Sequence, residues 1–316
     1  MRERKVVPAS VVNWRRARVY TMASLLRSLE HMAPVKPPWQ RLTEPLEHVA
    51  IAFLSALQSS PRRTRGLAFD CGAHDGRWSA QLLDTWANMS AAPRLRLHML
   101  EPQRTFARRL RYIEAATGGR ARYHPVVAST HNGNATLFSS LNSETSSLRL
   151  TMAARYGYRG HKRVIDAIDL ADMILDATVP STSRVTSHAD TDAKAAPPLL
   201  TFLKLDIEAS EFSLLPRLVV SGALCRIHFV LIEWHLNALR PAERLSGLGM
   251  LLSLEVMLRS GCPAPPVLQQ VVPHANNEGV EVPGLREAAK RHAASNRTRA
   301  DRDIWRHWAR AGSSRP

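Results

Sequence analysis

Short apolar runs alternate with stretches of helical periodicity over the middle of the chain. Trp78, Leu82, Trp86 and Met89 follow one such run at spacings of four, four and three, which predicts a helix over Trp78–Met89. Strands are predicted over Leu67–Gly72, Leu95–Leu100, Arg122–Ala128, Ala135–Ser139, Val164–Asp166, Leu199–Leu205, Ile227–Trp234 and Val267–Val272. Further helices are predicted after Pro102 and over Ile168–Leu175, Ala209–Gly222 and Pro241–Arg259. This alternation predicts a mostly parallel sheet with helices on both faces.

The segments outside this alternation differ in composition. Residues 1–64 are predicted to be a basic N-terminal extension with helices around Ser10–Leu29 and Glu44–Leu57. A domain is predicted over residues 65–275, with a flexible insertion at about 177–198 that is rich in Ser, Thr, Asp and Ala. Residues 276–316 are predicted to be a basic, helical C-terminal tail. The turn residues His131–Asn134 predict a hairpin that joins the third and fourth strands.

Basic residues are in excess, mainly near the two ends of the chain. The chain carries 43 Lys and Arg against 27 Asp and Glu, a net charge of +16, which favours an anionic partner. Much of the excess lies in residues 1–19 and between Arg286 and Arg310. Solvated basic extensions explain this distribution, and a nucleic-acid-binding protein built on an enzyme fold is the alternative.

The three cysteines, Cys71, Cys225 and Cys262, are widely spaced and form no CxxC pair. This predicts reduced thiols in an intracellular protein, and the spacing of Cys and His predicts no metal site. No apolar stretch reaches the roughly 20 residues that span a bilayer. Met1–Ala33 lacks a secretory apolar core, and its Arg-rich composition leaves organelle targeting open beside a soluble intracellular location.

The first predicted strand leads into a glycine-containing turn, Cys71–Gly76. Gly72 and Gly76 would let the backbone approach a ligand, and the helix that follows would point its N-terminus at it. Dinucleotide sites need a glycine in the middle of this turn, where His74 stands, so the pattern argues against NAD and FAD. No Lys-Ser/Thr pair follows either glycine, which excludes a P-loop.

A ligand with a ribose and no phosphate fits this turn better, and S-adenosylmethionine is such a ligand. Glu101 lies 25 residues after Gly76, at the end of the second predicted strand, where a carboxylate can accept hydrogen bonds from both ribose hydroxyls. Asp70 and Asp75 would place negative charge near the cationic end of the ligand. Ser129 follows the third strand at the same predicted edge. A plain turn with Glu101 as a helix N-terminal acid is the structural alternative.

An ordered series of motifs resembles the FkbM-type family of S-adenosylmethionine-dependent methyltransferases. The series covers about residues 66–236 and runs FDCGAHDG, LEP, VASTHNGNATLFSS, SSL, VIDAIDLADMI, FLKLDIEASEFSLL and VLIEWH. The family pattern is D-x-G-A-N-x-G, E-P, D-G-x-A-T-L, S-S-L, K-I-D-V-E-G-x-E and a final E-x-H. The resemblance implies a Rossmann-like class I methyltransferase fold with a mostly parallel seven-stranded sheet. It also implies O-methylation of a small molecule, sugar or lipid-like acceptor.

The chain departs from the family pattern at two places. His74-Asp75 replaces Asn-x, and Ala209-Ser210 replaces the Gly-Ala after Glu208. Loss of that glycine puts close backbone approach at this turn in doubt, although no carboxylate is lost.

The candidate catalytic residues follow the last two long strands. Asp206 and Glu208 follow one, and His235 follows the other as a candidate base or acceptor-orienting group. Glu211 can cap the next helix, and Lys204 shares the strand face of Asp206, where an ion pair would be structural. A nicotinamide-dependent dehydrogenase is the third function class considered, and His74 disfavours it.

Overall fold

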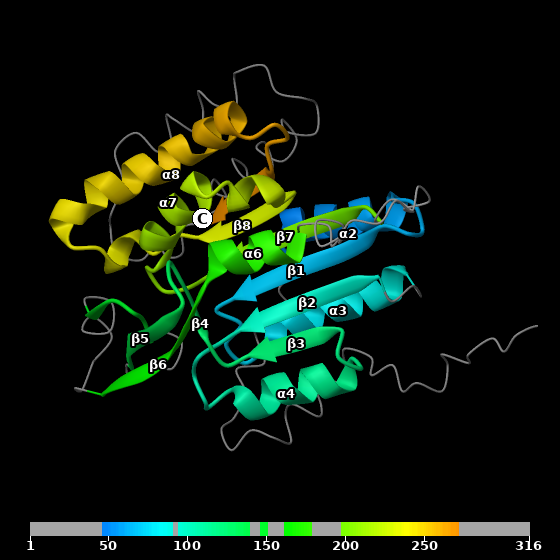
Figure 1. Cartoon of the computed structure of the whole chain (residues 1–316), viewed down its shortest axis with the longest axis horizontal. Coiled ribbons are helices and arrows are strands. Elements are labelled where there is room, and N and C mark those ends of the chain that lie inside the picture. The colour runs from blue at the N-terminus through cyan, green and yellow to red at the C-terminus, as the bar shows by residue number, and fades with distance from the viewer. Residues whose placement is uncertain (1–45, 91–93, 140–145, 151–160, 179–196, 272–316) are drawn as a thin grey trace, which may run out of the picture. The chain divides into compact units, whose positions relative to one another are not determined.

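Six parallel strands form the central sheet, in the order β3-β2-β1-β7-β8-β9 (Figure 1). They are β1 (Arg65–Cys71), β2 (Leu95–Leu100), β3 (Ala121–His124), β7 (Leu199–Leu205), β8 (Phe229–Glu233) and β9 (Val267–Val271). Strand order reverses between β1 and β7, where Asp70 pairs with Lys204 and Cys71 with Leu205. Ligands of open α/β sheets bind at such a switch point, beyond the carboxyl ends of the strands.

The computed structural model describes residues 46–90, 94–139, 146–150, 161–178 and 197–271. All of these lie in the first of the two units into which the chain divides, Met1–Val272 and Pro273–Pro316. The predicted helix at Ser10–Leu29, most of the insertion and the basic tail lie outside the described residues. The α/β fold class with its mostly parallel sheet is confirmed, and the described residues place six strands in the central sheet where seven were expected.

A second sheet of three strands lies beyond the carboxyl ends of β1, β2 and β3 in Figure 1. It consists of β4 (Val127–Ser129), β5 (Gly133–Phe138) and β6 (Lys162–Asp169). The predicted hairpin is wrong, because β6 lies between β4 and β5, parallel to the first and antiparallel to the second. The predicted third strand is divided at Pro125, since proline has no N–H for a strand ladder.

Helices cover both faces of the central sheet (Figure 1). They are α2 (His48–Ser59), α3 (Arg77–Met89), α4 (Ala107–Ala116), α6 (Leu170–Thr178), α7 (Glu211–Val220) and α8 (Pro241–Gly261), with 3-10 turns η4 (Ala223–Arg226) and η5 (Leu236–Ala238). The predicted helix after Pro102 begins only at Ala107. No helix among the described residues is long and apolar enough to cross a membrane.

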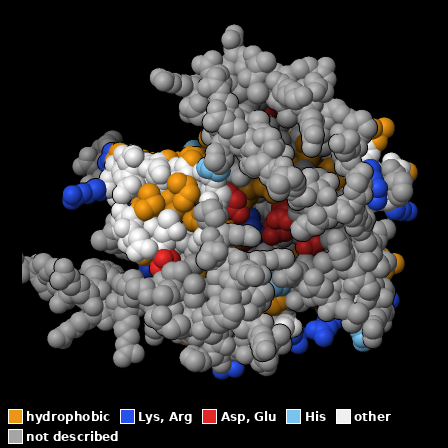
Figure 2. All heavy atoms as spheres, turned by 180° about the vertical axis from the view of Figure 1, so that it is seen from behind, with side chains coloured by type: hydrophobic (Ala, Val, Ile, Leu, Met, Phe, Trp, Pro, Cys, Tyr) orange, Lys and Arg blue, Asp and Glu red, His pale blue; other side chains and the backbone are white. Residues whose placement is uncertain are grey.

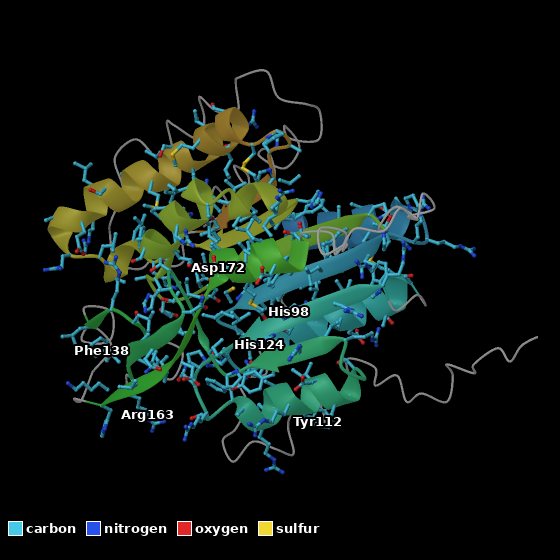
Figure 3. The ribbon with its side chains drawn as sticks, viewed as in Figure 1. His98, Tyr112, His124, Phe138, Arg163 and Asp172 are labelled. Carbon is cyan, nitrogen blue, oxygen red and sulfur yellow. A yellow bond between two sulfur atoms is a disulfide. The ribbon has the colours of Figure 1, made fainter. Side chains whose placement is uncertain are left out.

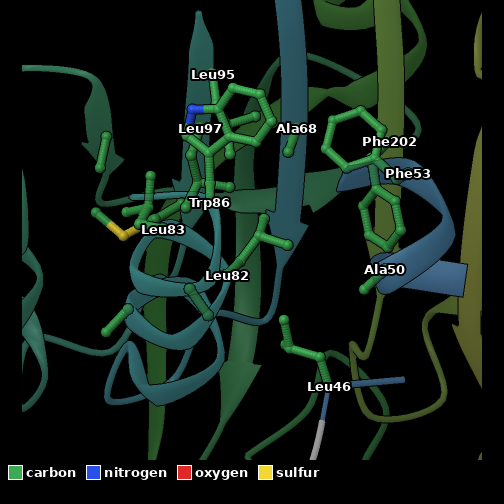
Figure 4. Packing of buried hydrophobic residues seen from close by; sticks show 14 of the residues in the cluster. Leu46, Ala50, Phe53, Ala68, Leu82, Leu83, Trp86, Leu95, Leu97 and Phe202 are labelled. Atoms are coloured by element: carbon green, nitrogen blue, oxygen red, sulfur yellow. The ribbon is translucent and has the colours of Figure 1, made fainter. Parts of the chain in front are cut away.

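The main core packs α2, α3 and α4 against one face of the sheet (Figure 4). Leu82 and Trp86 of the predicted helical stripe are fully buried, as the spacing predicts. Phe53 of α2 lies 5.3 Å, between ring centroids, from Phe202 of β7. Burial of one such aromatic side chain contributes about 2–3 kcal/mol. This core holds β1, β2 and β7 in place and thereby fixes the strand ends that carry the polar residues.

Two of the three cysteines form a disulfide. Cys225 in η4 is bonded to Cys262, with their Cα atoms 5.2 Å apart, while Cys71 is a buried free thiol. The prediction of three reduced cysteines is therefore wrong for this pair. The two residues are 37 positions apart in the sequence, and they meet because α8 and its C-cap at Cys262 return to η4. Sequence spacing alone carries no sign of such a contact.

Candidate active site at the switch point

The turn after β1 holds two glycines in left-handed conformations, with φ of 83° at Gly72 and 79° at Gly76. A Cβ on Gly72 would lie 1.8 Å from the backbone oxygen of Asp206, and one on Gly76 would lie 2.4 Å from Cδ1 of Ile113. Both glycines are therefore required by the packing of one chain segment against another. Their predicted role, close approach to a ligand, stays a prediction.

Glu101 lies at the end of β2 and faces this turn. Its Oε2 accepts a hydrogen bond from the backbone N–H of His74 at 2.9 Å, and its Oε1 accepts one from the N–H of Gln103 at 2.8 Å. The residue is 3% exposed, and burial raises the pKa of its carboxyl against the effect of these two hydrogen bonds. A carboxylate has about four lone-pair sites, so two remain for other donors. The structure thus holds Glu101 beside the turn, where the ribose prediction requires it.

Asp75 binds arginines on both sides of the turn. Its Oδ2 lies 2.7 Å from Nε of Arg77 and 3.2 Å from Nη1 of Arg109 in α4. Burial raises the pKa of Asp75, but the hydrogen bond from His74 and the charge of Arg77 outweigh it, so the net pKa is lowered. His74 has φ of 50° and its ring centroid lies 3.9 Å from that of Phe106. Asp75 therefore joins α4 to the turn, with its charge directed to two arginines.

Asp70 is fully buried below the turn. Its Oδ2 accepts a hydrogen bond from Ser79 at 2.6 Å, and its Oδ1 lies 3.4 Å from Nζ of Lys204. Lys204 also donates to Oδ2 of Asp206 at 2.9 Å, which confirms the predicted ion pair. Burial lowers the pKa of Lys204, and the charges of Asp206 and Asp70 outweigh it and raise the pKa. Asp70 is therefore held by Ser79 and Lys204, and its predicted role near the cationic end of the ligand stays a prediction.

Acidic side chains and a histidine meet where β7 and β8 end. Nε2 of His235 lies 3.5 Å from Oε2 of Glu208, 3.9 Å from Oδ1 of Asp206 and 3.9 Å from Oε1 of Glu233. Glu211, the first residue of α7, accepts a hydrogen bond from the backbone N–H of His235 at 2.7 Å, and the same oxygen lies 3.2 Å from Nδ1. We call these five residues the acid–histidine cluster. Figure 2 shows acidic side chains gathered near the middle of the rear face.

The carboxylates of the cluster perturb one another and the imidazole. Burial, with the charges of Asp206 and Glu211, raises the pKa of Glu208 to about 8. Burial and Asp206 raise that of Glu233 to about 7. Burial lowers the pKa of His235, but the hydrogen bond and charge of Glu211 and the other carboxylates outweigh it, so the pKa rises to about 10. The surrounding carboxylates thus stabilise the protonated form of the imidazole.

The turn after β7 is strained. Glu208 has φ of 51° and Ala209 has φ of 71°, in the left-handed region that glycine adopts most readily. Ala209 stands where the family pattern has glycine, and its side chain is fully buried. Ser147 stabilises the turn, because its Oγ donates to the carbonyl of Glu208 at 2.5 Å. Ser147 therefore closes this loop.

Ser129 is placed differently from the other predicted residues. It ends β4 in the three-stranded sheet, and its Oγ lies 3.2 Å from Nδ1 of His131. The structure thus brings Asp206, Glu208 and His235 together in one cluster and holds Glu101 beside the turn. Sequence reasoning missed Arg109 as the partner of Asp75, since a salt bridge across 34 residues has no local signal.

A separate pocket of about 430 Å³ lies between α6 and β2. Its lining consists of His98, Asn132, Ile168, Asp169, Asp172, Met173, Asp176 and Ala177. Figure 3 shows His98 on β2 beside His124 on β3, with their Nδ1 and Nε2 atoms 2.8 Å apart. Burial, with the positive charges of His124 and Arg122, lowers the pKa of His98 to about 4. No residue predicted for the active site lines this pocket.

A parallel sheet in this strand order, with polar residues at its switch point, is a Rossmann-like nucleotide-binding fold. The family model described as the methyltransferase FkbM domain matches residues 70–252, more than half of the chain. The chain therefore belongs to the FkbM methyltransferase family, and it is a methyltransferase. This decides against the dehydrogenase alternative. No curated protein and no solved structure matches the chain significantly.

Proposed function

We propose that the chain transfers a methyl group from S-adenosylmethionine to a hydroxyl of a small molecule, sugar or lipid-like acceptor. One observation carries the proposal. Glu101 is held beside the turn after β1, and the acid–histidine cluster lies at the neighbouring ends of β7 and β8. This arrangement supports a ribose acceptor and a proton acceptor at one edge of the sheet, as the reaction would require.

The cofactor would be held by the turn and by Glu101. The two unused lone-pair sites of the Glu101 carboxylate would accept the ribose hydroxyls. His74, with its side chain about one-third exposed, lies on Phe106 next to the carboxylate and would border the same ligand. The sulfonium would lie toward Asp206, whose backbone oxygen packs directly against Gly72. Ser129, in the three-stranded sheet, stays a predicted contact to the far side of the cofactor.

The acceptor hydroxyl would bind at the cluster. Methyl transfer is an in-line displacement in which the S–CH₃ bond breaks as the O–CH₃ bond forms. The products are S-adenosylhomocysteine, a methyl ether and one proton. Much of the rate comes from holding oxygen, methyl and sulfur in line. Asp206 and Glu208 would hold the hydroxyl and take up its proton.

His235 would position these carboxylates through its Nε2 edge. Glu211 holds the opposite edge of the ring, so the imidazole cannot rotate without breaking a buried contact.

A methyl-transfer screen tests the function. The purified chain is incubated with methyl-labelled S-adenosylmethionine and a panel of sugar, lipid-like, small-molecule and RNA acceptors. We expect label in a hydroxyl acceptor and at least a hundredfold lower kcat for Asp206→Asn and Glu208→Gln. Asp166→Asn, an exposed carboxylate on β6, is the matched control and should retain activity. Label transferred to RNA alone, or equal activity in all variants, would contradict the assignment.

The anionic-partner hypothesis has a different basis. It rests on the basic ends of the sequence, which lie outside the described residues. The RNA arm of the screen is therefore its test, and an RNA complex should weaken steeply with salt.

A further inference from the structure

Three side chains of the cluster each offer one possible metal-ligand atom close to the other two. They are Asp206, Glu208 and His235, and their donor atoms all lie within 4.8 Å of one another. A divalent ion with ligand bonds of about 2.1 Å needs donors about 3 Å apart at adjacent corners and about 4.2 Å apart at opposite ones. The contacts of 3.5 Å and 3.9 Å from Nε2 of His235 fall inside that range. We propose that these three residues bind a divalent cation.

The orientation of His235 supports this independently of the carboxylates. Its Nδ1 lies 3.2 Å from Oε1 of Glu211, a fully buried residue, and its own backbone N–H binds the same oxygen. Histidine ligands of metals typically donate one ring N–H to a carboxylate, which fixes the tautomer and directs the other nitrogen to the ion. His235 is 5% exposed and has this arrangement, with Nε2 directed into the cluster.

Glu208 supplies a second independent observation. Its Oε2 is buried and has no hydrogen-bond partner, although it lies in the cluster 3.5 Å from His235. Leaving a buried carboxylate oxygen without a partner is costly, and a coordinated cation removes that cost. Asp206 is arranged compatibly, since Lys204 binds its Oδ2 and its Oδ1 faces Nε2 of His235.

Charge balance points the same way. Among the described residues, five carboxylates surround two cationic side chains. The carboxylates are Asp70, Asp206, Glu208, Glu211 and Glu233, and the cations are Lys204 and His235. More acidic than basic side chains thus face this site, which favours a bound cation over a bound anion. An ion bound at Nε2 would leave the contact between Nδ1 and Glu211 intact.

The donor set selects the class of ion. Two carboxylates and one imidazole, with Glu233 within 3.9 Å of the same nitrogen, form an oxygen-rich site with one nitrogen. Such a set suits Mn²⁺, which accepts both donor types, over ions that prefer thiolates. The sequence predicts these three residues at one edge of the sheet, and the fold brings their donor atoms within 4.8 Å of one another.

The role of the ion, unlike its binding, rests on the proposed function. Three protein ligands leave open coordination positions, which an acceptor hydroxyl can occupy. Coordination would lower the pKa of that hydroxyl and fix its oxygen for the in-line displacement. Two adjacent open positions suit an acceptor with neighbouring oxygens, such as the vicinal hydroxyls of a sugar.

Electron paramagnetic resonance of Mn²⁺ tests the site on the full chain without cofactor or acceptor. We expect one Mn²⁺ per chain, with coupling to a single imidazole nitrogen in the wild-type protein. Asp206→Asn and Glu208→Gln should each weaken binding at least tenfold. Glu211→Gln should weaken it less and reduce the nitrogen coupling, because Glu211 only positions His235. Asp166→Asn is the matched control and should bind as wild type does.

Two results would overturn the site. One is a folded wild-type chain that binds no Mn²⁺ at millimolar concentration, and the other is binding without nitrogen coupling. The wild-type spectrum decides even where a variant fails to fold. A parallel titration with S-adenosylhomocysteine separates the two proposals. A chain that binds S-adenosylhomocysteine but does not bind Mn²⁺ would leave the proposed function standing and remove the metal site.

Discussion

Ala209 combines a fully buried side chain with a left-handed backbone, φ of 71°, next to Glu208 with φ of 51°. An L-residue in this region costs about 1–2 kcal/mol, and glycine avoids most of that cost. The two strained residues are Glu208, a member of the acid–histidine cluster, and Ala209, which lies between Glu208 and Glu211 in the sequence. Strain in such a place persists only where neighbouring contacts hold it, and Ser147 provides one through the Glu208 carbonyl.

Replacing Ala209 by glycine should therefore stabilise the protein. We expect Ala209→Gly to raise the free energy of unfolding by about 0.5–1 kcal/mol, measured by urea denaturation. The matched control is Ala52→Gly at an exposed position in the interior of α2, which should lower it by about 1 kcal/mol. An equal loss at both positions would show that Ala209 is unstrained and that its methyl group is needed for packing.

At the scale of elements, α4 is joined to the turn after β1 by charge as well as by apolar packing. Asp75 lies between Arg77 at the start of α3 and Arg109 in α4. Ile113 and Leu110 of α4 contact the same turn where Gly76 lacks a side chain. The turn, α3 and α4 thus form one unit that holds the N–H of His74 against Glu101.

Asp75→Asn should loosen this unit. The change leaves two arginines facing a neutral amide at a position 5% exposed, and we expect the free energy of unfolding to fall by about 2–3 kcal/mol. Differential scanning calorimetry measures the loss, and Asp166→Asn on β6 is the exposed control. If Asp75→Asn and the control have the same free energy of unfolding, the arginines contribute nothing to the attachment of α4.

Element prediction from the sequence succeeded where local patterns decide the structure. Leu199–Leu205 is a strand with the predicted bounds because its apolar run is long and closed by Asp206. The hairpin failed because strand pairing is non-local. β5 has turn residues before it, yet its partner is β6, whose Lys162 pairs with Phe138. Nothing in either strand alone identifies that partner.

The candidate site was predictable in its membership and unpredictable in its contacts. Parallel strands place their carboxyl ends together, so Asp206, Glu208 and His235 were expected at one edge, and the structure brings them within 4.8 Å. The attachment of His235 to Glu211 depends on where α7 begins after the strained turn. The close packing of Gly72 against the backbone of Asp206 depends on the register between β1 and β7. Neither has a signature in sequence spacing.

At the scale of the whole molecule, the Cys225–Cys262 disulfide joins η4 to the end of α8 across 37 residues. A cross-link that closes a loop of this length removes about 3–4 kcal/mol of unfolded-state entropy in the chain-entropy model. The bond ties the last described helix to the connection between α7 and β8. It therefore stabilises the arrangement that places His235 beside β7.

Thiol titration of the unfolded, unreduced chain checks this bond. We expect one reactive thiol, from Cys71, and three after reduction. Cys225→Ser should show two thiols without reduction and a lower melting temperature. Three thiols in the unreduced wild-type chain would show that the bond is absent in solution.

The central claim is that the turn after β1 and Glu101 together bind S-adenosylmethionine, and calorimetric titration tests it most directly. S-adenosylmethionine and S-adenosylhomocysteine are each titrated into the folded full chain, the Glu101→Ala variant and the Asp166→Asn control. We expect one binding site in the wild type and in the control. In Glu101→Ala, affinity should be at least a hundredfold lower because the ribose hydroxyls lose their acceptor. A folded wild-type chain that binds neither molecule, or a Glu101→Ala variant that binds as tightly as wild type, would contradict it.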